Sequence, residues 1–324
     1  MSETILRALD VKGYYKGVFG IIKAVDGVTI SLRKEERLGI AGESGCGKST
    51  FAKIITATRA PHLFYEGGKV EIEGYDIWRI PAEKLRKEVR CKLLSYIPQA
   101  SLSCLNPTLR IKEFIADMLE ERTGHKYSSE EAREMVADHF ERLNLDERVI
   151  DLYPHELSGG MKQRVIIAIS TYANPSLLIA DEPTSSLDVS SQRRVIEMLL
   201  DIYRKRIIKS LICIGHDLSV LRQLCDRLAI MYAGKLVEVG EMDDMVNEPL
   251  HPYTKMLLKS LLPLERRIKY EKIKSIPGRP PDLRNPPLGC RFYPRCPKRM
   301  EICRDTYPPL IKVDDRHVWC WLYS

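Results

Sequence analysis

A short segment of the chain has the pattern of a loop that binds phosphate groups. It fits G-x-x-x-x-G-K-[ST], and its residues are Gly42, Glu43, Ser44, Gly45, Cys46, Gly47, Lys48 and Ser49. A predicted strand ends at Ala41 and a helix-forming stretch runs over residues 50–57, which is the setting that such a loop needs. Glycines allow backbone N–H groups to surround an anion, and the dipole of the following helix favours negative charge. We therefore expect Lys48 to reach the β- and γ-phosphates of a nucleotide and Ser49 to bind Mg²⁺.

Two neighbouring acids, Asp181 and Glu182, follow the apolar run of residues 177–180. In an open α/β sheet, ligands bind at the carboxyl ends of the parallel strands, so acids placed there lie beside a phosphate-binding loop. We expect Asp181 to be the carboxylate on the Mg²⁺ side and Glu182 to orient or deprotonate the attacking water. A strand followed by Asp-Glu is a weak signal alone and a strong one when the loop accompanies it.

A second candidate anion site lies at residues 157–161, directly before a predicted helix. Its residues Ser158, Gly159 and Gly160 form a turn at a helix N-terminus, where backbone N–H groups and the helix dipole favour an anion. The ordinary alternative is an N-cap with a flexible turn. One nucleotide does not need two such sites from one chain. The pattern therefore favours a dimer in which the second site of each chain covers the nucleotide of its partner.

The order and spacing of these motifs resemble the ATP-binding cassette (ABC) family over the first 260 or so residues. Residues 42–49 are similar to its Walker A loop, 177–182 to its Walker B strand and 157–161 to its signature. Ser186-Leu187-Asp188 resembles the D-loop of the family, with Ser186 where alanine is common.

This resemblance implies further roles. Gln99 is similar to the Q-loop glutamine, which bridges Mg²⁺ and a transmembrane partner, and His216 to the switch histidine near the γ-phosphate. The catalytic residues that it implies are Lys48, Gln99, Glu182 and His216, and the Mg²⁺ ligands are Ser49, Gln99 and Asp181. The nucleotide-binding residues that it implies are Tyr15, Gly42, Glu43, Ser44, Gly45, Cys46, Gly47, Lys48, Ser49, Thr50, Gln99 and Asp181, with Ser158, Gly159 and Gly160 acting on the nucleotide of the partner. An aromatic residue before the first strand pair stacks on adenine in this family; Tyr14 and Tyr15 both qualify, and we favour Tyr15.

The C-terminal part of the chain narrows the resemblance. Three segments are similar to the C-terminal region of oligopeptide/dipeptide transporter ATPases: His251-Pro252-Tyr253-Thr254, residues 276–281 (IPGRPP) and residues 289–297 (GCRFYPRCP). Some members of that branch import oligosaccharides with the same type of ATPase, so peptide and oligosaccharide both remain open as substrates.

Four cysteines in this tail follow the spacing Cys290-x5-Cys296-x6-Cys303-x16-Cys320. Structural zinc usually shows Cys-x2–4-Cys pairs, which are missing here. Four thiolates from an irregular loop suit a [4Fe–4S] cluster, which tolerates varied spacing, and the branch includes members with clusters. We expect a structural [4Fe–4S] cluster, with zinc or free thiols as alternatives. The tail also holds cations that could offset the charge of an anionic cluster: Arg291, Arg295, Lys298, Arg299 and Arg304.

Bulk composition limits the remaining possibilities. The chain has 324 residues, of which 44% are apolar and 29% charged, as in ordinary globular proteins. Residues 265–324 hold 14 Lys and Arg against 7 Asp and Glu, which equals the whole net charge of +7. A basic segment of this kind indicates nucleic acid, anionic lipid, a solvated surface or compensation for an anionic cofactor. We find no secretory signal and no apolar run near the roughly 18 residues of a membrane span, and the scattered Cys46, Cys91, Cys104, Cys213 and Cys225 fit buried or half-buried thiols.

The elements that must position these residues follow from hydrophobic periodicity. Residues 28–41 predict two strands with a charged turn, and residues 69–80 an antiparallel pair. Residues 110–143 have apolar side chains at helical spacing, and from residue 175 short apolar strands alternate with helical stretches, which is typical of a parallel α/β core. The expected fold is therefore an α/β P-loop NTPase core of the ABC nucleotide-binding type, with an antiparallel β subdomain and a helical insert. We expect the ATPase domain at 1–264, its helical subdomain at about 100–172, and a Pro-rich four-cysteine module of irregular structure at 265–324.

The sequence thus predicts an ATP-hydrolysing motor subunit of an importer, placed peripherally on the cytoplasmic face of the membrane. The resemblance implies a second ATPase chain, a paralogue rather than an identical copy, two permease subunits and an extracellular substrate-binding protein. The alternative is a soluble ATPase of the same superfamily that acts on nucleic acid or ribosomes. A single cassette without a long coiled coil or an aromatic-basic pattern argues against that alternative, so no nucleic-acid partner is expected.

Overall fold

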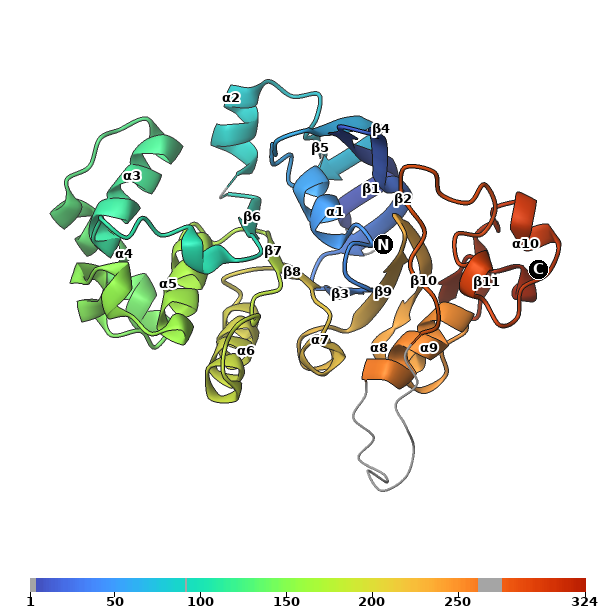
Figure 1. Cartoon of the computed structure of the whole chain (residues 1–324). Helices are drawn as coiled ribbons and strands as arrows, with labels where there is room; N and C mark the ends of the chain where they lie inside the picture. Colours follow the sequence, from blue (N-terminus) through green and yellow to red (C-terminus); the bar gives the residue numbers. More distant parts are fainter. Residues whose placement is uncertain (1–3, 91, 262–275) are drawn as a thin grey trace. The chain divides into compact units, whose positions relative to one another are not determined.

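The computed structural model describes residues 4–90, 92–261 and 276–324, and the chain forms two compact units (Figure 1). Unit 1 comprises Met1–Leu6, Arg33–Glu35 and Glu71–Ile212, and unit 2 comprises Arg7–Leu32, Glu36–Val70 and Cys213–Ser324. Each is described by itself below. The predicted boundary at residues 264–265 and the prediction for Cys91 lie outside the described residues.

The strands have the following bounds: β1 Thr4–Gly17, β2 Gly20–Arg33, β3 Arg37–Ala41, β4 Leu63–Ile72, β5 Tyr75–Asp76, β6 Leu94–Ile97, β7 Leu177–Asp181, β8 Ser210–Ile214, β9 Arg227–Tyr232, β10 Lys235–Glu241, β11 Ile311–Val313 and β12 Arg316–Val318. The two strands predicted within residues 28–41 are β2 and β3, separated by the charged turn 34–36. The pair predicted within residues 69–80 is β4 and β5, which run antiparallel around Gly74.

The α-helices have the following bounds: α1 Lys48–Ile55, α2 Ala82–Lys84, α3 Ile111–Thr123, α4 Ser129–Arg142, α5 Gly159–Thr171, α6 Val189–Arg204, α7 Leu218–Leu224, α8 Met242–Asn247, α9 Pro252–Leu261 and α10 Ile302–Asp305. Short 3₁₀ turns occupy Ser101–Ser103, Glu147–Asp151, Pro154–Glu156, Tyr293–Arg295 and Trp321–Tyr323, and a π-helical turn occupies Leu85–Val89. In the described parts of the chain, no helix combines the length and the apolar composition that crossing a membrane requires.

Unit 2 is built on two sheets. Strands β2, β1 and β4 lie side by side in that order, and a second sheet has the order β11-β12-β10-β9-β3. β3 and β9 are parallel, with Gly39 opposite Leu228, and both strands are almost completely buried, as expected of apolar runs covered on both faces. β10, a strand that the sequence analysis did not name, runs antiparallel to β9. The reason is local: Ala233 and Gly234 both have positive φ and form a two-residue turn that returns the chain at once.

The C-terminal residues of unit 2 are less irregular than the sequence suggests. Long loops do dominate residues 276–310, but β11 and β12 form a hairpin. β12 pairs with β10 in antiparallel register, with Glu238 opposite Val318 and Val239 opposite His317. The hairpin therefore extends the sheet that carries β3. In Figure 1 the red C-terminal segments lie beside the orange helices α8 and α9.

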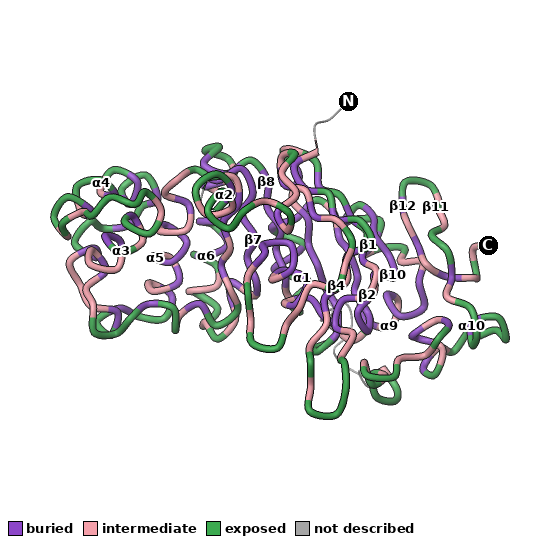
Figure 2. Tube along the Cα trace, turned by 90° about the horizontal axis from the view of Figure 1, so that it is seen from above, coloured by how far each residue is buried: buried purple, intermediate pink, exposed green. Residues whose placement is uncertain are grey.

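Unit 1 contains the predicted helices and the strand pair β6–β7. The stretch at residues 110–143 forms α3 and α4, which pack on each other and lie near α5 (Figure 1). α3 ends at Gly124, which has φ 77°, and α4 begins after Ser128, whose side chain accepts a hydrogen bond from the N–H of Glu131. β6 and β7 are parallel, with Ile97 opposite Ala180. Figure 2 shows the burial that results: α4 exposes one face to solvent, whereas the strands are mainly buried.

Candidate functional site

The phosphate-binding loop lies in unit 2 between β3 and α1, as the motif predicts. Its glycines are required by the backbone. Gly47 has φ 109°, and a Cβ atom there would lie 2.0 Å from the carbonyl oxygen of Ala24. At Gly42 a Cβ atom would lie 2.2 Å from the carbonyl oxygen of Met231. Only glycine fits at these two points, which brings the loop backbone close to neighbouring strands.

Lys48 begins α1 and is 6% exposed. Its Nζ donates hydrogen bonds to the carbonyl oxygens of Gly42 at 2.8 Å and Glu43 at 3.1 Å, so the loop curls around the ammonium group. The loop thus holds a positive charge at the N-terminus of a helix, where the helix dipole also favours anions. This arrangement suits the β- and γ-phosphates of a nucleotide.

His216 and Tyr15 also belong to unit 2. The N–H of Gly215 donates to the carbonyl oxygen of Ile40 at 3.1 Å, and Ile40 lies in β3, the strand that leads into the loop. His216 directly follows Gly215 and is exposed. The hydroxyl of Tyr15 lies 3.4 Å from Oγ1 of Thr50, in the helix that the loop begins. His216 and Tyr15 are therefore placed on elements that border the loop.

Tyr14 has a different environment from Tyr15. Its hydroxyl donates to Oδ1 of Asp26 at 2.6 Å, and its ring meets Phe64 edge-to-face at 6.0 Å. Burial and the bond to Asp26 raise the pKa of Tyr14 above its ordinary value. These contacts give Tyr14 a packing role and favour Tyr15 for the adenine, which stays a prediction.

The two acids and Gln99 come together in unit 1. Asp181 ends β7 and is 1% exposed, and Glu182 follows with φ 51°. Because β6 and β7 are parallel and in register, Gln99 lies just beyond the same end of the strand pair. Its Nε2 donates to Oε2 of Glu182 at 3.2 Å, and the hydroxyl of Tyr96 donates to Oδ2 of Asp181 at 3.4 Å. The contact of Tyr96 with Asp181 was not foreseen, although Tyr96 stands in the same short segment as Gln99.

The signature residues lie at the N-terminus of α5, also in unit 1. Ser158 is the N-cap, and its Oγ accepts a hydrogen bond from the N–H of Met161 at 3.3 Å. Ser158 and Gly159 are exposed, whereas a Cβ atom on Gly160 would lie 2.6 Å from Oγ of Ser191 in α6. The turn is therefore both an N-cap and an exposed helix N-terminus, so the two interpretations of it are compatible.

The D-loop leads into α6 in unit 1. Ser186 has φ 63°, and Asp188 is the N-cap of the helix. The Asp188 carboxylate accepts hydrogen bonds from Oγ of Ser190 at 2.6 Å and from the N–H of Ser191 at 3.0 Å, which lower its pKa below the ordinary value. Asp188 is thus an ionised capping residue at the expected position of the motif.

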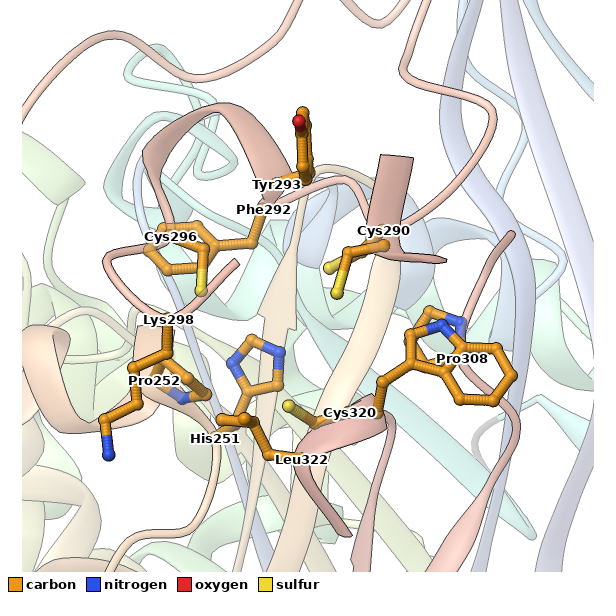
Figure 3. A pocket seen from close by; sticks show the side chains of 12 residues that line it. His251, Pro252, Cys290, Phe292, Tyr293, Cys296, Lys298, Pro308, Cys320 and Leu322 are labelled. Carbon is orange, nitrogen blue, oxygen red and sulfur yellow. The ribbon is translucent and has the colours of Figure 1, made fainter. Parts of the chain in front are cut away.

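The four tail cysteines line one pocket in unit 2. The pocket has about 310 Å³ of space, including open solvent, and its lining residues are His251, Pro252, Cys290, Phe292, Tyr293, Cys296, Lys298, Cys303, Pro308, Cys320, Trp321 and Leu322. Figure 3 shows the thiols of Cys290, Cys296 and Cys320 directed toward a common space beside the His251 ring. Among the described residues, no group of three or more His, Cys, Asp or Glu side chains is arranged to hold a metal ion. The predicted metal centre is therefore not supported as a preformed site for a single ion.

Two residues of the C-terminal part of the chain, Tyr253 of α9 and Arg295 of the four-cysteine module, also contact the phosphate-binding loop, which the sequence did not predict. The N–H of Glu43 donates to the hydroxyl of Tyr253 at 2.9 Å, and the Glu43 carboxylate accepts two hydrogen bonds from Arg295. Both partners stand in segments that resemble the peptide transporter ATPases, HPYT and PRCP. That location is the one signal that could have singled them out.

Comparisons with known proteins agree with this arrangement. Residues 25–185 match the ABC transporter family and residues 237–303 the oligopeptide/dipeptide transporter C-terminal region. The dipeptide transport ATP-binding protein DppD of Caldanaerobacter subterraneus is 40% identical over 99% of this chain and 97% of its own length. The oligopeptide transport ATP-binding protein AppF of Bacillus subtilis is 40% identical over 100% of this chain and 98% of its own length.

Solved structures show the same fold. The ATP-binding cassette MJ0796, in a dimeric post-hydrolysis state bound to ADP and phosphate, has a TM-score of 0.63 and 26% identity, and the match covers 73% of this chain and 98% of that one. The expected α/β fold of ABC ATPases is thereby confirmed. Together with the full-length relatives, these matches show that the chain belongs to the ABC transporter family of ATPases, in the branch that carries the oligopeptide/dipeptide transporter C-terminal region.

Proposed function

We propose that this chain is the ATP-hydrolysing motor subunit of a peptide importer. The observation that carries the proposal is a complete set of ABC ATPase motifs followed by the C-terminal region of oligopeptide and dipeptide transporters. The most similar relatives described above are named as dipeptide and oligopeptide transport proteins, which favours peptides over oligosaccharides as the cargo. The same C-terminal match disfavours the alternative of a soluble ATPase on nucleic acid or ribosomes.

In this proposal Lys48 and the loop N–H groups bind the phosphates, while Tyr15 stacks on the adenine. Ser49, Gln99 and Asp181 offer the oxygen donors that Mg²⁺ prefers; when bound, Mg²⁺ neutralises charge on the phosphates. Glu182 orients and deprotonates the attacking water, held by its hydrogen bond from Gln99. His216 contacts the γ-phosphate.

The proposed assembly contains a second ATPase chain. The exposed turn at Ser158 and Gly159 covers the nucleotide of that partner, which makes each ATP a bridge between two chains. We propose that the partner is a paralogue, that two permeases and an extracellular binding protein complete the importer, and that this subunit lies on the cytoplasmic face of the membrane.

Affinity purification of the tagged chain from mild detergent extracts of its native cells tests this function. We expect membrane permease subunits and a second ABC ATPase to co-purify, and peptides delivered by the binding protein to stimulate ATP turnover in proteoliposomes. Recovery of ribosomes or DNA in place of permeases would support the alternative. Stimulation by oligosaccharides rather than peptides would correct the cargo.

We also propose that the four-cysteine pocket holds a [4Fe–4S] cluster with a structural role. All four thiols line one space, and the positively charged Lys298 lines it as well. A [4Fe–4S] cluster takes one thiolate at each of its four irons, which matches the number of thiols that line this pocket. Burial raises the pKa of Cys290 to about 12, so this thiol must lose its proton when a cluster binds.

The cluster proposal predicts about four irons and four acid-labile sulfides per chain after anaerobic purification, with a broad visible absorption band. Because the thiols must lose protons, loading should weaken as the pH falls. Cys303→Ser should lower the iron content, whereas Cys104→Ser, at an exposed cysteine outside the pocket, should leave it unchanged. A colourless, zinc-loaded or metal-free protein would show that the assignment is wrong.

A further inference from the structure

Arg295 of the C-terminal module holds a glutamate of the phosphate-binding loop. Its Nη1 and Nη2 donate to the two carboxylate oxygens of Glu43 at 2.7 and 2.9 Å. Its remaining N–H groups donate to the carbonyl oxygens of Pro277 at 2.8 Å and Ile276 at 3.3 Å and to the hydroxyl of Tyr232 at 3.2 Å. All five donors of the guanidinium are therefore used, which fixes its position.

This ion pair is shielded from solvent. The Arg295 side chain is 4% exposed and that of Glu43 22%. The guanidinium also lies over the ring of Tyr232, 5.7 Å from its centroid. A paired charge in such a site depends on its partner, because removal of one member leaves the other without compensation.

The short turn that carries Arg295, Tyr293–Arg295, also borders the cysteine pocket. Arg295 directly precedes Cys296, and Phe292, which directly precedes this turn, lines the pocket beside it (Figure 3). The Phe292 ring packs against Tyr232 at 5.2 Å and against Tyr253 at 5.3 Å between centroids. The Tyr253 hydroxyl in turn accepts a hydrogen bond from the N–H of Glu43. The segment Phe292–Arg295 is therefore linked to the loop in two ways: by the ion pair of Arg295 with Glu43, and by the packing of Phe292 on Tyr253.

The negative charge of Glu43 opposes phosphate binding, and Arg295 compensates this charge. A carboxylate within a loop that binds the phosphates of ATP repels them, and the repulsion is strong where water is partly excluded. A bidentate guanidinium neutralises this carboxylate and fixes its position. The loop can then present its N–H groups and Lys48 to the phosphates.

We propose that Arg295 is a positioning residue for ATP binding, and that the packing of the cysteine pocket sets ATP affinity through the Arg295–Glu43 pair. The proposal rests on the proposed ATPase function but goes beyond it, since it assigns the module a role in nucleotide affinity. Coupling between two sites is reciprocal. ATP bound at the loop therefore stabilises the turn that carries Cys296 and protects the pocket thiols.

The test measures ATP binding by the full chain with a fluorescent ATP analogue, at fixed salt and pH. ATP binding by the wild-type chain is measured first. A wild type that does not bind ATP would reject the proposed ATPase function, which keeps that outcome separate from a failure of the role proposed for Arg295. Arg295→Met should raise the Kd for ATP by at least about tenfold, because the Glu43 carboxylate loses the guanidinium that compensates its charge. Arg316→Met is the matched control. Arg316 is another buried arginine of the module, its Nη1 donates to the carbonyl oxygen of Glu248, and its replacement should leave the Kd unchanged.

A second variant separates charge repulsion from general loss of structure. In the Arg295→Met background, Glu43→Gln removes the unpaired carboxylate and should restore the Kd to within about threefold of wild type, a non-additive result. Arg295→Lys, which keeps the charge but cannot bridge both oxygens, should fall between wild type and Arg295→Met and serves if the Met variant does not fold. A wild-type Kd in Arg295→Met, or in Arg295→Lys if only that variant folds, would overturn the proposal, as would a double variant as weak as Arg295→Met.

Thiol labelling checks the reciprocal effect without measuring catalysis. In the full chain from which any bound metal has been removed, peptide-level mass spectrometry after iodoacetamide treatment should show that ATP slows labelling of Cys290 and Cys296 in the wild type, several-fold. The protection should disappear in Arg295→Met at ATP concentrations that still saturate it. Equal labelling with and without ATP in the wild type would refute the coupling between pocket and loop.

Discussion

Replacing Glu182 with Gln should lower ATP turnover by roughly 10²–10⁴-fold, the usual contribution of a general base. The amide cannot accept the proton of the attacking water but keeps the shape of the side chain and can still accept the hydrogen bond from Gln99. ATP binding should therefore survive. Because hydrolysis is what separates the chains in the proposed cycle, the variant, purified together with the proposed paralogous ATPase chain, should accumulate with it as an ATP-bound dimer. This dimer is seen as the summed mass of the two chains in size-exclusion chromatography with light scattering.

Glu197→Gln provides the control for this substitution. Glu197 is an exposed acid of α6 in the same unit, paired with Arg193 at 2.9 Å, and its removal should change neither the turnover nor the mass. Hydrolysis by Glu182→Gln at the wild-type rate would remove Glu182 from its assigned role. A variant that binds ATP without hydrolysing it, but stays separate from the second ATPase chain, would keep the catalytic role and reject the dimer.

Replacing Gly47 with Ala should abolish measurable ATP binding, a loss of at least about a hundredfold. The added Cβ would lie 2.0 Å from the carbonyl oxygen of Ala24, and φ of 109° is strained for alanine even in open space. Strain at such a position costs about 1–3 kcal/mol before the clash is counted. The loop must therefore shift, and its N–H groups no longer point toward the phosphates. Isothermal titration calorimetry with ATP and Mg²⁺ measures the effect.

Gly124→Ala tests whether positive φ alone accounts for the loss. Gly124 has φ 77° at the end of α3, and a Cβ atom there meets open space. Its replacement should cost about 1 kcal/mol of stability and leave the Kd for ATP unchanged. Wild-type affinity in Gly47→Ala would show that the loop tolerates a side chain and that the close approach to Ala24 is not required.

The sequence predicted best what local pattern determines. The loop at 42–49 and the strands at 37–41 and 177–181 follow from glycine spacing and apolar runs, and the family assignment built on them is confirmed. The helices within 110–143 follow from periodicity, but the sequence analysis did not place the break between them at Gly124 and Ser128. The roles of the individual site residues stay predictions.

Other features depend on contacts between distant residues, which no local pattern contains. Arg295 and Glu43 are 252 positions apart, and neither residue signals the other. The hairpin of β11 and β12 joins β10 across more than 70 residues of intervening chain. The antiparallel course of β10 depends on the turn at Ala233, a residue type that rarely indicates a turn with positive φ. The convergence of four cysteines was expected from their number, but the pocket that they share with His251 was not.

The pairing of β12 with β10 also bears on how the protein avoids self-association. Without the hairpin, β10 would be an edge strand of seven residues, most of them buried, with a row of free backbone groups that can template another chain. The hairpin replaces this edge with β11, which has three residues and carries Lys312. Short, charged edges discourage sheet-to-sheet stacking between molecules. The hairpin of the module thus protects the sheet from aggregation through the β10 edge. We expect a chain that ends before residue 311 to precipitate during expression.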